Sequence, residues 1–276
     1  MYVQPSQAAE RKPVTVPGLR AMKARGERIT ALTCYDASMA AQLEAAGIDI
    51  ALVGDSLGMV VQGHASTLSV TLDQMIYHTA ASARGVRATL LIADMPFMSY
   101  RDPATALASA GRLMAEGGAA MVKLEGAGWA CEVIAALAAH DVPVCAHLGL
   151  TPQSVHKLGG YRLQGKQQDA AEKLVADAHA VAAAGAELLV LEYVPAPLAA
   201  RITRELAIPT IGIGAGPDCD GQVLVTYDLL GLTPGRRPRF SKDFLAGRDS
   251  IQAALAAFAE DVRAGRFPGP EHSYQS

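Results

Sequence analysis

The sequence has no long apolar run, no strong net charge and few aromatic residues. Aromatic residues make up 5% of the 276 residues and charged residues 18%, and the net charge is −3. No apolar stretch reaches the length of about 18 residues that a membrane span needs. The small charge gives no reason to expect nucleic acid as a partner. The first residues lack the cationic and apolar regions of a secretory signal. We therefore expect a cytoplasmic protein without membrane or nucleic-acid partners.

Cysteine pairs and nucleotide-binding motifs are also missing. The four cysteines lie far apart and form no C-x-x-C pair. This spacing favours the reduced thiols of a cytosolic protein over a disulfide framework or a zinc site. Neither a P-loop nor an H-E-x-x-H motif occurs, so NTPase and zinc-protease chemistry have no support. One short basic cluster, residues 236–239, is interpreted as a solvated loop.

What the sequence does contain is a repeated order of apolar run, polar residue and helical segment. Eight such alternations favour a closed (β/α)8 TIM barrel over an open, doubly wound sheet. No linker interrupts the series, so we expect a single domain over residues 13–276, after a disordered segment at 1–12. A short helix is expected after Pro17, and a last helix from Ser250 to Ala264 with Asp249 as its cap.

The expected elements follow from the apolar runs and from helix start and stop signals. The expected strands comprise residues 28–33 and 48–53, a run ending at Asp94, 120–124, runs ending at His147 and Glu192, then 210–213 and 238–242. Only a few residues support the eighth strand. The helices between them comprise residues 38–46, 71–84, 103–116, 129–140, about 168–184, 197–206 and 220–230. Long glycine-containing loops are expected at 54–69 and 149–168.

Polar residues stand where the apolar runs of the predicted strands end. In chain order these residues are Asp55, Asp94, Lys123 with Glu125, His147 and Glu192. All strands of a (β/α)8 barrel run in the same direction, so their carboxyl ends meet at one face. That face carries the active site in enzymes of this architecture. The pattern therefore predicts one crevice in which these side chains converge.

Two aspartates on neighbouring strands can share one hard cation. Asp55 and Asp94 end the second and third predicted strands, and Mg²⁺ favours one or two carboxylates together with water and substrate oxygens. Glu125 could join them directly or through water. The alternative for either aspartate is a structural cap of a turn or helix.

Lys123 and His147 admit several roles. Lys123, between apolar neighbours and beside carboxylates, could hold an anionic substrate, form a structural ion pair, or serve as a Schiff-base amine if its pKa were depressed. His147 could donate a hydrogen bond to a substrate oxygen, act as an acid, or be a satisfied core residue.

Glu192 follows the apolar run 188–191 and is the candidate base. A carboxylate in apolar surroundings has its pKa raised by desolvation, which suits a general base near neutral pH. The competing interpretation is a salt-bridged glutamate at the rim of the barrel.

Two glycine-bearing runs suggest other sites. Residues 54–58 formally match the G-x-S-x-G nucleophile elbow, but the elbow needs a helix directly after the serine, whereas a long loop is predicted here. We prefer Ser56 as a hydrogen-bond donor to a ligand. Residues 212–216 resemble a dinucleotide motif but carry Pro217 where the last glycine should stand. Close approach of the backbone to a ligand, or tight turning, explains them better.

These motifs together resemble the ketopantoate hydroxymethyltransferase family. The resemblance extends in order from about residue 29 to the C-terminus and includes irregular loops. The matching segments are 53–59, 62–64, 77–79, 93–98, 122–126, 147–154, 159–161, 191–192, 211–216, 220–222 and 271–273. Two positions depart from the family pattern: Ala127 interrupts an expected glycine pair, and Tyr193 replaces a small residue.

The resemblance implies a reaction and assigns a role to each candidate residue. The family transfers a hydroxymethyl group from 5,10-methylenetetrahydrofolate to 3-methyl-2-oxobutanoate, which gives 2-dehydropantoate for pantothenate synthesis. Asp55, Asp94 and Glu125 then resemble the acidic Mg²⁺ groups, with one ion per subunit. The resemblance further implies that Asp55, Ser56, Asp94, Lys123 and, nearby, His147 contact the oxo acid, that Glu192 is the proton acceptor, and that the chain forms a homodecamer.

Two rival functions remain from the residues alone. A lyase of the isocitrate-lyase or phosphonopyruvate type also uses Mg²⁺ and the enolates of 2-oxo acids, but it works without folate. The isocitrate-lyase type carries a cysteine loop similar to K-K-C-G-H, which is absent from this sequence. A barrel kept only for binding or as a scaffold is the non-enzymatic alternative, and the presence of all the strand-end acids disfavours it.

Overall fold

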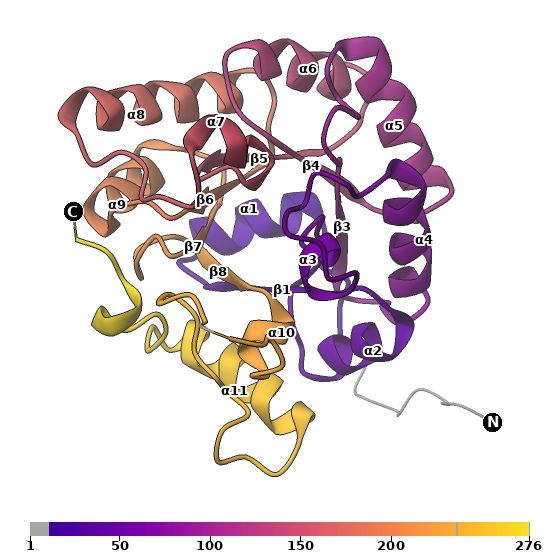
Figure 1. Ribbon diagram of the computed structural model, residues 1–276, viewed down its shortest axis with the longest axis vertical. Coiled ribbons are helices and arrows are strands. Elements are labelled where there is room, and N and C mark those ends of the chain that lie inside the picture. Colours follow the sequence, from indigo (N-terminus) through magenta and orange to yellow (C-terminus); the bar gives the residue numbers. More distant parts are fainter. Residues whose placement is uncertain (1–10, 236, 276) are drawn as a thin grey trace.

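Eight parallel strands form a closed barrel with helices around it (Figure 1). The structure is a computed structural model, and it describes residues 11–235 and 237–275. The strands are paired in sequence order, and β8 closes the barrel against β1. They are β1 (Ile29–Thr33), β2 (Ile50–Val53), β3 (Leu90–Asp94), β4 (Met121–Glu125), β5 (Val144–Gly149), β6 (Leu188–Glu192), β7 (Thr210–Ile213) and β8 (Gly221–Leu224). The predicted (β/α)8 fold is confirmed.

Several of the helices begin at side chains that accept hydrogen bonds from the first turn. Asp36, Thr71 and Asp102 each accept one from the backbone N–H three residues on. The helices are α1 (Val16–Ala24), α2 (Ala37–Ala45), α3 (Leu57–Val60), α4 (Leu72–Ala83), α5 (Pro103–Ala115), α6 (Trp129–Ala138), α7 (Val155–Leu158), α8 (Gln168–Ala183), α9 (Ala196–Glu205), α10 (Thr226–Leu229) and α11 (Ile251–Arg263), with 3₁₀ turns at Pro152–Ser154 and Pro270–His272.

Side chains alternate along each strand between two apolar cores. One core fills the barrel interior and includes Ile50, Ile92, Met121 and Val190. The other lies between the strands and the surrounding helices and includes their sequence neighbours, such as Leu91. Because successive residues of a strand point to opposite faces, the interior residues Ile92 and Met121 set the direction of Asp94 and Lys123, two positions later.

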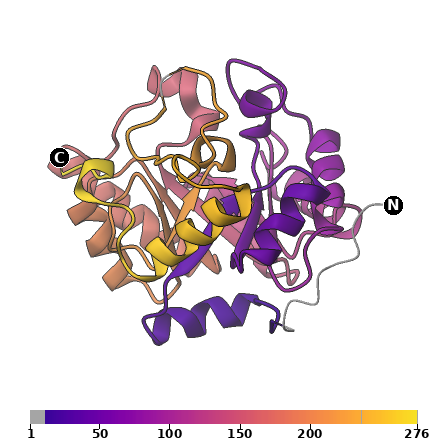
Figure 2. The same ribbon diagram turned by 90° about the horizontal axis from the view of Figure 1, so that it is seen from below.

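Helix α1 lies across the amino-terminal end of the barrel, as Figure 2 shows. Its Leu19 is 1% exposed and packs into the interior core. The helix therefore closes this end with apolar side chains, and the opposite end stays accessible.

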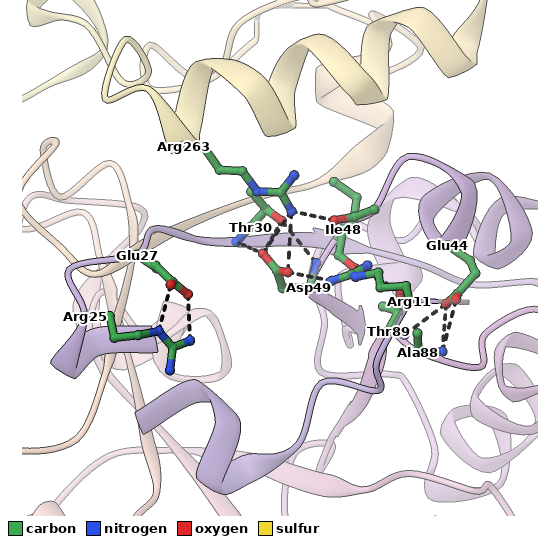
Figure 3. A network of polar contacts seen from close by, with 11 residues as sticks. Arg11, Arg25, Glu27, Thr30, Glu44, Ile48, Asp49, Ala88, Thr89 and Arg263 are labelled. Carbon is green, nitrogen blue, oxygen red and sulfur yellow. Dashed lines mark hydrogen bonds and ion pairs between the residues drawn. The ribbon is translucent and has the colours of Figure 1, made fainter. Parts of the chain in front are cut away.

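A buried aspartate ties the strands and terminal segments together at this same end (Figure 3). Asp49, directly before β2, accepts hydrogen bonds from the backbone N–H and hydroxyl of Thr30 at 2.9 and 2.7 Å. The guanidinium groups of Arg11 and Arg263 also pair with its carboxylate. Nearby, Glu44 accepts hydrogen bonds from the N–H groups of residues 87–89.

The prediction that residues 238–242 form the eighth strand was wrong. Residues 221–224, assigned to a helix from the sequence, form β8, and residues 238–242 form neither strand nor helix. A run of four residues is too short for its periodicity to separate a strand from a helix. Pairing with β1 and β7 decides the matter, since both offer free strand edges to the segment that begins at Gly221.

Other expectations need smaller corrections. The loop after Asp55 contains α3, which begins directly after Ser56, and the loop after β5 contains α7. Ser250, rather than Asp249, caps α11. Of the segment expected to be disordered, residues 1–10 lie outside the described residues, and Arg11 is held by Asp49. Within the described chain, no helix is long and apolar enough to cross a membrane.

Candidate active site

All seven residues singled out from the sequence line one cavity at the carboxyl ends of the strands. Its volume is about 650 Å³. We call the part formed by Asp55, Asp94, Lys123, Glu125, His147 and Glu192 the floor of the cavity. The first five of these residues are at most 5% exposed, and the side chain of Glu192 is 16% exposed. Ser56 lies at the edge of the floor. The predicted convergence is confirmed, whereas the roles of the individual residues stay predictions.

Strand register brings floor residues side by side. Asp94 lies opposite Lys123, and Glu125 lies opposite His147. Gly149, at the end of β5, has a positive φ of 91°, and a Cβ there would lie 2.2 Å from the carbonyl oxygen of Glu192. A side chain at position 149 would therefore push apart the two strand ends that carry His147 and Glu192.

The loop after β2 folds back onto Asp94. The backbone N–H of Asp55 donates to Asp94 Oδ2 at 3.0 Å. Ser56 Oγ forms a hydrogen bond of 2.8 Å with the hydroxyl of Tyr35. A short helix does follow Ser56, contrary to expectation, but no imidazole is bonded to this hydroxyl in the described part of the chain. The nucleophile interpretation of Ser56 therefore gains nothing from α3.

Lys123 is held as a buried ammonium group. Its Nζ donates to Asp94 Oδ1 at 2.8 Å, and its side chain is 6% exposed. Burial alone would lower the pKa of Lys123, but the negative charges of Asp94, Glu125 and Asp55 raise it above its ordinary value. A Schiff-base amine needs the opposite shift, so the geometry disfavours that alternative.

Gln153, to which the sequence analysis assigned no role, links the acidic groups of the floor. Its amide Nε2 donates to Asp55 Oδ2 at 2.8 Å and to the carbonyl of Met95 at 3.0 Å, while its backbone N–H donates to Glu125 Oε2 at 3.0 Å. Tyr100 donates to Gln153 Oε1 at 2.5 Å. Gln153 lies in the short 3₁₀ turn after β5, and Tyr100 lies in the loop after β3. Neither segment is long enough for a periodicity that indicates which way a side chain points.

The floor has a surplus of negative charge. Burial, followed by repulsion from Asp94, raises the pKa of Asp55 to about 7. Burial, followed by repulsion from Asp55, raises the pKa of Glu125 well above its ordinary value. Four carboxyl groups thus face one ammonium group. A divalent cation would reduce the repulsion among these carboxyl groups.

The donor set fits a hard cation that keeps part of its coordination for substrate and water. Asp55 and Asp94 supply carboxylate oxygens, and Mg²⁺ needs only one or two of these from the protein. In residues 11–235 and 237–275, no group of three or more His, Cys, Asp or Glu side chains is placed so that it could hold a metal ion. Glu125 as a third metal group stays a prediction.

His147 lies between two carboxyl groups. Its Nδ1 is 3.6 Å from Glu125 Oε1 and its Nε2 is 3.4 Å from Glu192 Oε2. Neither nitrogen has a hydrogen-bond partner among the residues described. Burial and the charge of Lys123 lower the pKa of His147 well below its ordinary value. The imidazole is therefore neutral, with one nitrogen free to donate and the other to accept.

Glu192 has the properties expected of a general base. Burial raises its pKa to about 7, and the charge of Lys123 offsets part of this rise. The nearest cationic candidate for a salt bridge, His147, is neutral. The geometry therefore favours the base over the salt-bridged alternative at this position.

A second group of side chains lines the cavity beyond the floor, and sequence reasoning missed it as a group. These residues come from the loop after β6, from α10 and the loop that follows it, and from the C-terminal segment. We call them the outer wall: Tyr193, Asp228, Arg237, Arg239, Phe240 and Tyr274. Three residues of the basic cluster that was interpreted as a solvated loop, Arg237, Pro238 and Arg239, thus line the cavity. In the 212–216 run, Gly214 and Gly216 have positive φ, which confirms tight turning, and the ring of Phe240 packs against Gly214.

Comparison with known proteins identifies the family. The model of the family described as ketopantoate hydroxymethyltransferase matches residues 13–270. The chain belongs to this family. A 3-methyl-2-oxobutanoate hydroxymethyltransferase of Burkholderia multivorans is 57% identical over 268 residues, which are 97% of this chain and 98% of the relative. One from Alkalilimnicola ehrlichii is 57% identical over 264 residues, which are 96% and 95%.

Solved structures outside the ketopantoate hydroxymethyltransferase family share the fold. A phosphonopyruvate hydrolase in complex with oxalate and Mg²⁺ has a TM-score of 0.61 at 15% identity, over 90% of this chain and 96% of that one. A 2,3-dimethylmalate lyase has a TM-score of 0.56 at 17% identity, over 91% and 94%. At such low identity, the likeness extends only to the barrel architecture.

Proposed function

We propose that the chain transfers a hydroxymethyl group from 5,10-methylenetetrahydrofolate to 3-methyl-2-oxobutanoate and so forms 2-dehydropantoate for pantothenate synthesis. Family membership supports the kind of reaction. The observation that carries the proposal is the position of the largely buried Glu192 carboxyl group in the same cavity as an ammonium group and two aspartates. Desolvation also raises the pKa of Glu192 to about 7. A small anionic substrate with an acidic C–H bond suits this arrangement.

The floor binds and orients the oxo acid. The Lys123 ammonium attracts the substrate carboxylate, and its contact with Asp94 fixes its position. Ser56 Oγ and the neutral His147 ring can each donate a hydrogen bond to a substrate oxygen. Asp55 and Asp94 would hold Mg²⁺, with Glu125 joining directly or through water. When bound there, the ion would stabilise the negative charge that develops on the oxo acid.

Glu192 removes the proton from C3 of the oxo acid. The C–H bond breaks, the proton passes to a Glu192 oxygen, and the electron pair enters the enolate. Water adds to the methylene carbon of the folate, and its two C–N bonds break, which releases tetrahydrofolate and leaves the one-carbon unit at the oxidation level of formaldehyde. The enolate carbon then bonds to this carbon, whose oxygen takes a proton and becomes the hydroxyl group of the product. The low exposure of the floor keeps the enolate from being quenched by bulk water.

One assay tests this function against its nearest rival. Purified protein is incubated with the oxo acid, with and without 5,10-methylenetetrahydrofolate and with and without MgCl₂, and 2-dehydropantoate is measured. We expect product only when folate and metal are both present. Turnover of the oxo acid that is independent of folate would favour the lyase instead. The homodecamer, which the resemblance implies, stays a prediction that native mass spectrometry can test.

A further inference from the structure

The cavity is larger than the oxo acid requires. Pockets of about 300–1,000 Å³ hold drug-sized ligands, whereas a five-carbon oxo acid can occupy only a small part of the 650 Å³ found here. The floor contains the charged groups that such an acid needs. The outer wall therefore remains for a second and larger molecule, in direct continuity with the floor.

We propose that the outer wall binds the reduced folate. Asp228 faces the pterin, and Arg239 holds the glutamate tail. The rings of Tyr193, Phe240 and Tyr274 pack on the flat faces of the folate. This inference rests on the proposed function, because that function is what requires a folate in this cavity. It adds the residues that hold the folate and the orientation in which it lies.

Three aromatic rings meet in the outer wall. The rings of Tyr193 and Tyr274 lie 4.6 Å apart with an interplanar angle of 77°, and those of Tyr193 and Phe240 lie 6.1 Å apart at 62°. Edge-to-face packing of this kind leaves ring faces available to a planar ligand, except for the face of Tyr274 that the Arg239 guanidinium covers. A pterin and its aminobenzoyl group are planar and match such faces.

Tyr193 is held in an unusual backbone conformation directly beside the base. Its φ is +53°, a region that residues other than glycine rarely adopt. Two backbone hydrogen bonds hold it there: its N–H donates to the carbonyl of Ile213 at 2.9 Å, and its carbonyl accepts from Gln164 at 2.9 Å. This conformation lets Glu192 and the Tyr193 ring both line the cavity. A ligand that packs on the ring would lie next to the group that takes the proton.

Asp228 provides a buried acceptor that the proposed floor chemistry does not use. It is 7% exposed, lines the cavity, and its Oδ1 accepts from Thr233 Oγ1 at 2.5 Å. A pterin presents two adjacent N–H donors on its amino-pyrimidinone edge, and a carboxylate is the side chain that accepts both. The position of Asp228 therefore orients the pterin edge toward α10.

Arg239 supplies positive charge and connects the outer wall to the C-terminal segment. Its Nε donates to the carbonyl of Glu271 at 2.8 Å, and its guanidinium lies 5.2 Å from the centre of the Tyr274 ring. The N–H of Ala196 donates to the carbonyl of Tyr274 at 2.7 Å, which fixes the segment against the start of α9, near the C-terminus in Figure 1. The carboxylates of a glutamate tail would meet a guanidinium that is already positioned.

A neighbouring cavity offers an alternative place for a flat ligand. It has a volume of about 320 Å³ and lies on another side of Glu125, with Trp129 in its lining. Trp129 is 57% exposed and stacks on Tyr100. Glu192 does not line this cavity, so a folate bound there would be separated from the base. The outer wall fits better for that reason.

Binding measurements on two probes separate the proposed contacts. The probes are 5-formyltetrahydrofolate, which carries the glutamate tail, and 6-methyltetrahydropterin, which lacks it, and each is titrated by calorimetry in the absence of oxo acid. For Arg239→Gln we expect about a tenfold weaker Kd for the folate, the size of one charge-assisted hydrogen bond, and an unchanged Kd for the pterin. For Asp228→Asn and Tyr274→Ala we expect weaker binding of both probes.

Control variants guard against simple misfolding and against the rival cavity. Tyr274→Phe keeps the ring and should bind both probes more tightly than Tyr274→Ala does, and thermal melts establish that each variant is folded. Trp129→Ala should leave both Kd values unchanged. A loss of folate binding in Trp129→Ala with no loss in the Arg239 and Tyr274 variants would overturn the proposal, as would equal weakening of both probes by Arg239→Gln.

The outcome also separates this inference from the proposed function. Exchange of the C3 hydrogen of the oxo acid into D₂O, measured by NMR without folate, reports on the floor alone. If the unmodified chain catalyses exchange but the outer-wall variants bind folate normally, the folate site is wrong and the function stands. If the unmodified chain binds folate through the outer wall but catalyses no exchange, the function is wrong and the binding site stands.

Discussion

The two ends of the barrel differ in how many hydrogen-bond and cationic partners their carboxylates have. At the amino-terminal end, Asp49 receives two hydrogen bonds from Thr30 and ion pairs from Arg11 and Arg263. At the carboxyl end, four carboxyl groups share Lys123, and both nitrogens of His147 lack a hydrogen-bond partner in the described structure. At the amino-terminal end the negative charge of Asp49 is balanced by its partners. At the carboxyl end the negative charge of the four carboxyl groups exceeds the single positive charge of Lys123.

This difference separates stability from chemistry within one fold. A satisfied buried carboxylate joins segments that are distant in the chain, such as β1, α11 and Arg11. An uncompensated one is unfavourable in the folded state, but its raised pKa makes it able to accept a proton near neutral pH. Substitutions at either end of the barrel, and changes of pH, test this contrast.

Replacing Glu192, the proposed base, should have the largest effect on catalysis. In Glu192→Gln we expect metal and oxo-acid binding to persist while C3–H exchange falls by about 10²–10⁴-fold, the usual contribution of a general base. The matched control is Glu187→Gln, which alters a glutamate directly before the start of the same strand, paired with Arg20. Unchanged deuterium exchange in Glu192→Gln would refute the assignment.

Removing a carboxylate from the floor should weaken substrate binding. In Asp94→Ala we expect the affinity for the oxo acid in MgCl₂ to fall by about 100-fold, since contacts to charged groups contribute about 1.5–3 kcal/mol each. Lys123 and the Asp55 N–H also lose their partner. Calorimetric titration measures the change, and a normal affinity that still depends on the metal would contradict the role given to Asp94.

Removing the carboxylate at the other end should affect folding instead. In Asp49→Asn we expect a loss of about 2 kcal/mol in the free energy of unfolding, because charged hydrogen bonds to Thr30 are weakened. Thermal melts and C3–H exchange by the folded protein report the two effects separately. Asp73→Asn, which alters an exposed carboxylate paired with Arg112, should change stability by less than about 1 kcal/mol. A large loss of exchange in folded Asp49→Asn would break the contrast between the two ends.

Activity and stability should respond to pH with opposite signs. Burial raises the pKa of Glu192 from 4.5 in the unfolded chain to about 7, so the folded state binds more protons in this window and loses stability as the pH rises through it. Glu192 loses its proton over the same pH range and can then act as a base. The rate of C3–H exchange should therefore increase with pH, with an apparent pKa of about 7. Glu192→Gln should melt at a higher temperature than the unmodified chain above pH 7 and should not gain this advantage near pH 5. An equal difference at both pH values would argue against a titrating Glu192.

The strand ends were predictable because they depend on local pattern. A short apolar run followed by Asp94, Lys123 or Glu192 shows where a strand stops, and parallel strands in a barrel bring their ends to one face whatever the loops do. The sequence also placed most helices to within a few residues, since caps such as Asp102 before Pro103 are local signals. Substrate and folate came from the family resemblance, because no periodicity encodes them.

Gln153, Asp228 and the outer wall could not be predicted in this way. These residues lie in loops or short helices, and their directions depend on contacts with distant segments, as with Ala196 and Tyr274. The same reason explains the misplaced eighth strand: residues 221–224 become a strand only because β1 and β7 leave edges to pair with.

The sequence by itself determined the barrel, the carboxyl-end crevice and the residues of its floor, because alternation and strand ends are properties of neighbouring residues. Only the tertiary structure decided which carboxylates are satisfied and which are not. Whether a carboxylate is satisfied depends on its burial and on partner side chains that are far away in the sequence. Arg11 and Arg263 pair with Asp49. The neutral His147, in contrast, cannot balance the negative charge of Glu192.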